Sequence, residues 1–199
     1  MVINKKLREI IVGLLLGDGS FEKKKDTLGI RLQIKQQSKA KEYVEWLYRH
    51  FQGMCLSGVK FRNDYGQYYF STRYLREFQE LYSLFYVNGK KIVPNNIRKL
   101  LTSPVSLAIW YIDDGSLDYR PKNHYAFYLA SNCFTVEDSK ILTATLRENF
   151  GITSTVYNNL CRGKRYSRIY IGAEGRTRFC QTVQPFILNC FSYKLPHHT

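Results

Sequence analysis

Two stretches of the sequence run from apolar residues into an aspartate, a glycine and a serine. They are LLLGDGSF at 14–21 and WYIDDGSL at 110–117, so Asp18 and Asp114 hold equivalent places nearly half the chain apart. Two carboxylates that converge repel each other unless cations sit between them. Mg²⁺ prefers a few hard oxygen ligands. The pair therefore predicts a metal site for phosphodiester hydrolysis, where metal ions activate water and stabilise the leaving oxygen.

An Asp-Gly pair by itself is a common turn signal before a β-hairpin, so turn formation is the competing interpretation. The recurrence at a duplicated position favours chemistry. Gly13 and Gly17 favour it further, because glycine inside a helix costs about 1 kcal/mol relative to alanine and suits a place where another backbone comes close. We expect two helices to lie side by side about a pseudo-twofold axis, with Asp18 and Asp114 at one end of their contact.

The apolar spacing of the first half predicts the element order α-β-β-α-β-β-α. A helix is expected from residue 5 to about 17, and the alternating segment 29–36 is expected to be a strand with its partner and turn in 23–29. Ser38 is the expected N-cap of a helix over 38–51. A second hairpin over 58–73 turns at 63–66, and a third helix covers 74–86.

The second half repeats this order. Helices are expected over 103–113, 135–151 and 176–187, and hairpins over 114–132 and 154–172. Ordered landmarks such as Phe78 with Phe179 and Lys91 with Lys194 support an internal duplication. The predicted fold class is α+β, with two pseudo-twofold-related repeats at 1–100 and 101–199 whose antiparallel sheets form a saddle.

Composition narrows the class of protein. The chain has 199 residues, with 30 Lys and Arg against 16 Asp and Glu, a net charge of +14, and 16 tyrosines. Such a chain favours nucleic acid as partner. A membrane protein is excluded, because the longest apolar run, 10–16, is far below the roughly 20 residues of a spanning helix. The five cysteines form no C-x-x-C pair, and together with a start that has no signal-peptide core they predict buried thiols and an intracellular protein.

The polar faces of the two sheets are the predicted DNA-reading surfaces. β-Ribbons that enter the major groove can distinguish base edges, with Arg and Gln selecting bases and many Lys holding phosphates. Solvated strand faces are the alternative for any one residue. The predicted DNA contacts are Lys24, Arg31, Gln33, Lys35, Lys60, Arg62 and Gln67 in the first half, and Arg120, Lys122, Asn123, Tyr157, Asn159, Lys164, Arg165 and Arg168 in the second.

Two segments resemble a known motif. IVGLLLGDG at 11–19 and LAIWYIDDG at 107–115 are similar to the two copies of the LAGLIDADG motif in homing endonucleases. KKIVPNN, WYIDDG and YKLP resemble the single-chain, two-motif branch represented by the yeast mitochondrial ribosomal-RNA-intron endonuclease. The resemblance implies a monomeric, intron-encoded enzyme that uses Mg²⁺, with Mn²⁺ able to substitute, to cut both strands of a long non-palindromic DNA and leave short 3′ overhangs.

The resemblance also implies the roles of individual residues. Asp18 and Asp114 would bind the metals with help from the backbone carbonyls of Gly17 and Asp113. Lys91 and Lys194 would polarise water or steady charge on the phosphate; a solvated surface charge is the alternative. The two remaining implied catalytic residues, which would organise water near the metals, are Gln36 and Asn132.

The second motif departs from the family pattern, because Ile109 and Asp113 stand where small residues are usual. An asymmetric helix contact is therefore expected, with Asp113 adding charge to the site or disturbing it. Two alternative functions remain open on the same fold: an RNA maturase that binds intron RNA, and a non-cleaving nucleic-acid-binding protein such as a transcription factor. The expected compartment is an organelle (mitochondrion or chloroplast) or the bacterial or archaeal cytoplasm.

Overall fold

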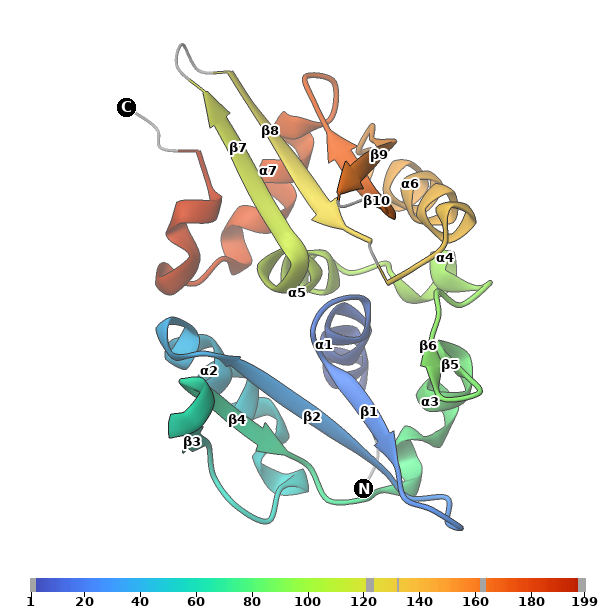
Figure 1. The fold of residues 1–199 in the computed structure, drawn as a ribbon, viewed down its shortest axis with the longest axis vertical. Coiled ribbons are helices and arrows are strands. Elements are labelled where there is room, and N and C mark those ends of the chain that lie inside the picture. Colours follow the sequence, from blue (N-terminus) through green and yellow to red (C-terminus); the bar gives the residue numbers. More distant parts are fainter. Residues whose placement is uncertain (1–2, 121–123, 132, 162–163, 197–199) are drawn as a thin grey trace.

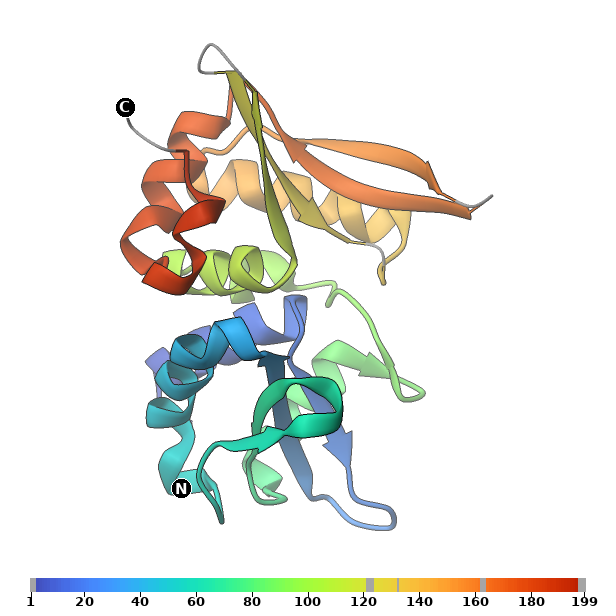
Figure 2. The same ribbon diagram turned by 60° about the vertical axis from the view of Figure 1, so that its left-hand side comes forward.

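The chain folds into two lobes, one above the other in Figure 1, and each lobe holds one four-stranded antiparallel sheet. The computed structural model describes residues 3–120, 124–131, 133–161 and 164–196, with the backbone alone described at 158–161 and 164–166. Within these ranges, no helix is both long and apolar enough to cross a bilayer. Figure 2 shows that the helices of each lobe gather on one side of its sheet.

The first lobe has the strand order β1-β2-β4-β3. Its elements are α1 (Lys5–Leu16), β1 (Ser20–Lys23), β2 (Ile30–Gln37), α2 (Lys41–Phe51), β3 (Lys60–Arg62), β4 (Gln67–Ser71) and α3 (Gln79–Phe85). The strict alternation predicted for the second strand is confirmed, because Ile30, Leu32 and Ile34 are buried. Their neighbours along β2 face away from the helices, since successive side chains point to opposite sides of a sheet.

The second lobe repeats the arrangement with the order β7-β8-β10-β9. Its elements are α5 (Pro104–Asp114), β7 (Gly115–Arg120), β8 (His124–Ala130), α6 (Val136–Phe150), β9 (Thr155–Cys161), β10 (Lys164–Ile171) and α7 (Arg176–Val183). Helix α6 has clear local signals at both ends. Thr135 and Asp138 form a reciprocal capping box at its start, and Gly151, in the left-handed conformation, ends it. The predicted α+β class and repeated element order are confirmed; the boundary between residues 100 and 101 stays a prediction.

The structure corrects several predicted boundaries. The partner of β2 is 20–23 and the turn is 24–29, so the strand partner begins earlier than expected. Ser38 does not cap α2 but begins a 3₁₀ turn, Ser38–Ala40, which delays the α-helix to Lys41. The helix predicted over 74–86 is α-helical only in α3, because the 3₁₀ turn Arg76–Phe78 precedes it.

Three further segments were not predicted. The link between the lobes contains a small hairpin, β5 (Tyr86–Val87) with β6 (Lys90–Lys91), and the short helix α4 (Ile97–Leu100). After α7 and the 3₁₀ turn Gln184–Phe186, a 3₁₀ helix, Asn189–Lys194, returns the chain toward α5. The prediction of buried thiols is confirmed for Cys180, but Cys55 and Cys190 are half-buried and Cys133 is exposed.

Helices α1 and α5 cross where the two lobes meet (Figures 1 and 2). A Cβ atom added at Gly13 would lie 2.6 Å from the carbonyl oxygen of Ser106 and 2.8 Å from the Cβ of Ile109. At Gly17 it would lie 2.5 Å from the Cβ of Asp113. The glycines of α1 therefore make room for larger residues of α5, and the predicted asymmetry of this contact is confirmed.

Candidate active site and nucleic-acid interface

The two aspartates of the repeated junctions converge at one end of the α1–α5 contact. Asp18 follows the last residue of α1 by two positions, and Asp114 is the last residue of α5. The backbone N–H of Asp18 donates to Oδ2 of Asp113 at 3.1 Å. Gln36, near the end of β2, donates from Nε2 to Oδ2 of Asp18 at 2.9 Å and to Oδ1 of Asp113 at 3.2 Å. Residues from both halves thus form one polar cluster.

Asp113 occupies the centre of this cluster. Besides the bonds from Gln36 and the Asp18 backbone, its Oδ1 accepts a hydrogen bond from the hydroxyl of Tyr43 at 3.0 Å. Burial and the charge of Asp18 raise the pKa of the Asp113 carboxyl well above its ordinary value. Three donors surround its oxygens, and the bonds from Tyr43 and the Asp18 backbone lower this pKa without cancelling the effect of burial. Asp113 therefore links Asp18 of the first half to Gln36 and to Tyr43 of α2.

The charges at this junction act on one another. Burial, followed by the charge of Asp18, raises the pKa of Asp114 from 3.8 to about 6. The lysines Lys91 and Lys194 work in the opposite direction but do not cancel the effect. Asp18 itself is exposed. The site therefore has two accessible or partly accessible carboxylates in a field that favours an added positive charge.

Lys91, in the unpredicted hairpin β5–β6, reaches the end of α1. Its Nζ donates to the carbonyl of Gly17 at 2.8 Å and to that of Gly19 at 2.7 Å. Burial lowers the pKa of Lys91. These carbonyls flank Asp18 just beyond the last residue of α1, so Lys91 anchors the segment that bears Asp18. An ammonium group has three donors, and two are used within the described part of the chain.

Lys194 holds the equivalent place in the second half and is 7% exposed. Its Nζ donates to the carbonyls of Tyr111, Ile112 and Gly115 at 3.2, 2.6 and 2.8 Å. Gly115 corresponds to Gly19, so both lysines contact the carbonyl that follows an aspartate of the pair. Burial lowers the pKa of Lys194 to about 8. All three donors of Lys194 are used, so it is the more firmly anchored of the two lysines.

The donor set fits a hard divalent cation. It consists of the carboxylates of Asp18 and Asp114 and the adjacent carbonyls of Asp113 and Gly17, all of them oxygens, although the Gly17 carbonyl already accepts a bond from Lys91. Among the described residues, no group of three or more His, Cys, Asp or Glu side chains could hold a metal ion. Mg²⁺ and Mn²⁺ suit such an incomplete oxygen set when water and phosphate complete the coordination. A cation here would also offset the repulsion by Asp18, which adds to the effect of burial in raising the pKa of Asp114.

The outer face of the first sheet brings together most of its predicted DNA contacts. A groove of about 250 Å³ is lined by Arg31, Gln33, Lys35, Arg62, Gln67 and Tyr69. Lys60 lines a neighbouring groove. The guanidinium of Arg62 lies over the ring of Tyr69, 5.4 Å from its centroid. Lys24 lies apart, in the turn after β1, 6.0 Å from the centroid of the Tyr74 ring.

The outer face of the second sheet is more aromatic. The ring of Tyr128 lies 5.3 Å from that of Tyr170 and 6.4 Å from that of Tyr157, centroid to centroid, and Tyr157 is 53% exposed. Arg168 pairs with Tyr157 across strands β10 and β9. Arg120 forms an ion pair of 2.9 Å with Asp118 on its own strand. Of the other predicted DNA contacts, Lys122 and Asn123 lie outside the described residues, and the side chains of Asn159, Lys164 and Arg165 are not described. Asn132, which was predicted to be catalytic, also lies outside the described residues.

A family model described as the LAGLIDADG DNA endonuclease family matches residues 8–179, which include both aspartates and both sheets. The chain belongs to the LAGLIDADG DNA endonuclease family. A relative within the curated proteins, cytochrome b mRNA maturase bI2 of Debaryomyces hansenii, is 31% identical and aligns with 98% of this chain and 76% of its own length. "Probable intron-encoded endonuclease 1" of Wickerhamomyces canadensis is 28% identical, over 97% of this chain and 85% of its own length.

Solved structures agree with this membership. The homing endonuclease I-WcaI, bound to its DNA recognition sequence, superposes with a TM-score of 0.85 at 26% identity and covers 100% of this chain and 89% of its own. I-DmoI in complex with DNA and Mn shares the fold, with a TM-score of 0.58, 17% identity, and coverage of 91% and 97%. The predicted single-chain, two-lobed LAGLIDADG architecture is thereby confirmed. The finer likeness to the ribosomal-RNA-intron endonuclease stays a prediction.

Two participants in this LAGLIDADG site were not predicted in their present roles. Tyr43 belongs to the buried, mostly apolar face of α2, yet its hydroxyl contacts Asp113. A buried tyrosine hydroxyl usually finds a partner, which was the available signal. Glu22 was not among the predicted site residues, although it contacts both Arg31 and Gln33. Its place opposite Arg31 in the hairpin register was the signal that could have identified it.

Proposed function

We propose that this chain is a site-specific homing endonuclease that makes a metal-dependent double-strand cut in a long, non-palindromic DNA target. The observation that carries the proposal is the convergence of Asp18 and Asp114 between two sheets whose outer faces bear predicted DNA contacts. A pure binding protein has no need for paired carboxylates facing phosphate. The membership in a DNA endonuclease family supports the same conclusion.

The proposed roles follow from the contacts of the site. Asp18 and Asp114 hold divalent metal ions, Mg²⁺ or Mn²⁺, with the carbonyls of Gly17 and Asp113 as neighbouring ligands. Bound metal ions supply activation of water and stabilisation of the leaving oxygen. Gln36 orients the Asp18 carboxylate through its bond of 2.9 Å. Lys91 retains a donor for a phosphate or a water molecule, and Lys194 fixes the end of α5.

DNA binding is proposed to use both sheets of a single chain. The net charge of +14 provides attraction to the phosphates along the duplex. If each sheet covers about ten base pairs, the target spans about two turns of the double helix. The two outer faces differ in chemistry, so the half-sites need not be related by symmetry. A monomer suffices because one chain supplies both lobes.

The test starts from a relative with a solved DNA complex. A DNA library built on the recognition sequence of I-WcaI, with positions varied one or two at a time, is incubated with the protein and Mg²⁺. We expect selective cutting of a subset, no cutting without divalent metal, and loss of cutting by at least about 100-fold in Asp18→Asn and Asp114→Asn. Tight, selective binding with all DNA intact would refute the nuclease.

A second function is favoured by one specific observation, the 31% identity to a cytochrome b mRNA maturase. We propose intron RNA as a second partner, with splicing assistance as an activity separable from cleavage. A splicing assay on the intron that encodes the chain would compare the wild type with Asp18→Asn. Retained splicing with lost cleavage supports two activities, whereas unchanged intron RNA with the wild type excludes the maturase. An organelle or a bacterial or archaeal cytoplasm stays the predicted compartment.

A further inference from the structure

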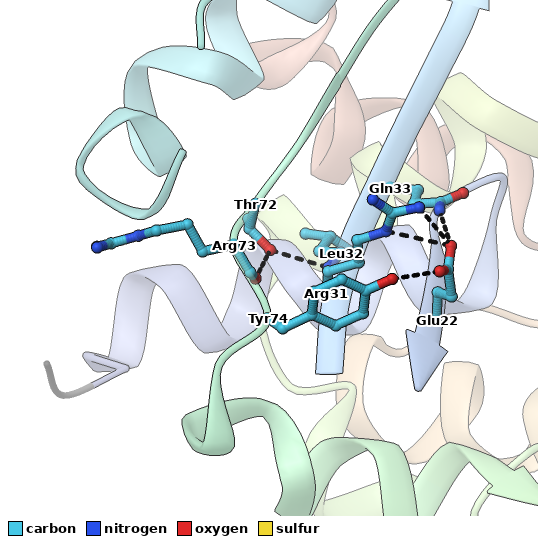
Figure 3. A network of polar contacts seen from close by, with 7 residues as sticks. All are labelled: Glu22, Arg31, Leu32, Gln33, Thr72, Arg73 and Tyr74. Atoms are coloured by element: carbon cyan, nitrogen blue, oxygen red, sulfur yellow. Dashed lines mark hydrogen bonds and ion pairs between the residues drawn. The ribbon is translucent and has the colours of Figure 1, made fainter. Parts of the chain in front are cut away.

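Four side chains of the first lobe form a polar network on the sheet face that is proposed to contact DNA (Figure 3). Glu22 lies opposite Arg31 in the β1–β2 register. Its Oε2 accepts from Nε and Nη2 of Arg31 at 3.1 and 2.8 Å, and also from Nε2 of Gln33. Its Oε1 accepts from the hydroxyl of Tyr74. A single carboxylate thus gathers two residues that were predicted to read bases.

The network is held from behind by the backbone. The hydroxyl of Thr72 accepts from the N–H of Leu32 at 3.0 Å and donates to the carbonyl of Arg73 at 2.9 Å, as Figure 3 shows. This fixes the segment that bears Tyr74 against β2. The Arg31 guanidinium in turn lies 5.0 Å from the centroid of the Tyr74 ring. Tyr74 therefore supports Arg31 by a ring face and Glu22 by a hydroxyl.

A carboxylate on this face requires an explanation, because it repels phosphate. Its bonds to Tyr74 and Arg31 lower the pKa of Glu22, so it is ionised at neutral pH. A surface ion pair adds little stability, since such pairs contribute about 0–1 kcal/mol. The side chains of Arg31 and Glu22 remain 34% and 42% exposed. A gain in stability therefore does not explain why Glu22 lies among the predicted DNA contacts.

The geometry of the donors gives a better reason. Arg31 commits its Nε–Nη2 edge to Glu22, which leaves Nη1 outside this ion pair, and Arg31 lines the groove together with Gln33 and Lys35. Arginine reads guanine with two N–H groups, and glutamine reads adenine with one N–H and its carbonyl oxygen. Gln33 gives one N–H to Glu22 and keeps the other with its oxygen. Both residues therefore retain what recognition of a base edge needs, in a fixed orientation.

We infer that Glu22 is a specificity-determining positioning residue, which locks Arg31 and Gln33 into one unit that reads neighbouring base pairs as a guanine and an adenine. The inference rests on the proposed function, because it assumes that this sheet face meets the major groove. Glu22 acts through its two partners and touches no base itself. Its removal should therefore change which sequences are accepted more than how tightly DNA in general is held.

The experiment is a position-by-position specificity profile for the wild type, Glu22→Gln, Arg31→Met and Gln33→Leu. DNA selected by binding without metal is sequenced, so the profile does not depend on cleavage. Arg31→Met and Gln33→Leu identify the base pairs that these side chains read. We expect Glu22→Gln to reduce discrimination by about 5- to 100-fold at those base pairs, the range of one bidentate contact, and to leave other positions unchanged.

Controls separate positioning from charge and from folding. Asp64→Asn removes one negative charge from an exposed residue in the turn between β3 and β4, and should alter no position of the profile. Tyr74→Phe keeps the ring under Arg31 but removes the hydroxyl, and should relax the same positions by a smaller factor. Thermal unfolding of each variant confirms that it is folded before selection.

Several outcomes would overturn the inference. A profile of Glu22→Gln that matches the wild type, or one that relaxes evenly at every position, would show that Glu22 positions neither reader. Selection of no sequence by the wild type would refute the inference together with DNA recognition. Normal selection with uncut DNA in the presence of Mg²⁺ would refute only the proposed nuclease, so the two failures are distinguishable.

Discussion

Replacing Asp114 with asparagine should stabilise the metal-free protein at neutral pH. Burial and the charge of Asp18 raise the pKa of Asp114 from 3.8 to about 6. The folded protein therefore holds this proton more tightly than the unfolded chain does. The free energy of unfolding should fall as pH rises from about 4 to 6, and the loss should be complete above that window. Asparagine removes the ionisable group and with it this loss.

The size of the effect follows from the pKa values. A change from 3.8 to about 6 corresponds to about 3 kcal/mol, since each pKa unit is worth about 1.36 kcal/mol. Asp114 is partly exposed, and solvent screening reduces this figure. We expect Asp114→Asn to be more stable than the wild type by about 1–2 kcal/mol at pH 7.5 without metal. The two proteins should have similar stability near pH 4.

The assay is urea unfolding at a series of pH values, with chelator and then with Mg²⁺. Mg²⁺ should stabilise the wild type, because a ligand of the folded state adds to its stability. It should stabilise Asp114→Asn much less. Asp64→Asn is the matched control, because it makes the same change at an exposed turn residue. An Asp114→Asn protein that is destabilised at pH 7.5, or that keeps the wild-type slope between pH 4 and 6, would refute the reasoning.

Three further predictions concern the surroundings of the site. Gly17→Ala should lower the free energy of unfolding by about 1–3 kcal/mol, because the added Cβ would lie 2.5 Å from the Cβ of Asp113. Gly53→Ala should have little effect, because the space around Gly53 is open, and urea unfolding measures both variants. Tyr43→Phe removes a hydrogen bond to Asp113 and should lower the free energy of unfolding by about 1–2 kcal/mol. It should also slow single-turnover cleavage more than it weakens DNA binding, and equal losses in rate and affinity would contradict a positioning role. Lys194→Met should destabilise the chain by about 2–4 kcal/mol, because three carbonyls lose their donor. Burial lowers the pKa of Lys194 from 10.5 to about 8, so the free energy of unfolding of the wild type should increase as the pH rises from about 8 to 10.5. An increase of the same size in Lys194→Met would exclude Lys194 as its source.

Local periodicity was sufficient to predict the helices and the strand that carry Asp18, Asp114 and Gln36, but not the hairpin and the 3₁₀ helix that carry Lys91 and Lys194. The alternation of β2 and the apolar stripe of α1 depend on neighbours in sequence, so their patterns are visible without a structure. The repeated junction added one long-range fact, because two copies of a unit that pack alike must place Asp18 and Asp114 at equivalent ends of a common contact. The convergence of the pair follows from that duplication.

Contacts between distant segments were the part that could not be predicted. The hydroxyl of Tyr43 meets Asp113 across 70 positions of sequence, and Lys91 meets Gly17 across 74. No local pattern encodes these pairs, because they depend on how the lobes and the linking hairpin dock. Glu22 is an intermediate case, since the hairpin register places it opposite Arg31 but only the side-chain geometry adds Gln33 and Tyr74.

The two halves of the site have kept one feature and diverged in another. Both lysines contact the carbonyl that follows an aspartate of the pair, Gly19 in one half and Gly115 in the other. At the position before each aspartate the halves differ, with Gly17 in the first half and Asp113 in the second. The two residues face each other, and there is no room for a side chain at position 17. An acidic side chain at the centre of the cluster is therefore possible in one half only. The pseudo-symmetric fold brings Asp18 and Asp114 together. The Gly17–Asp113 pair breaks the symmetry, and through it Asp113 of the second half binds both Gln36 and the backbone N–H of Asp18 in the first half.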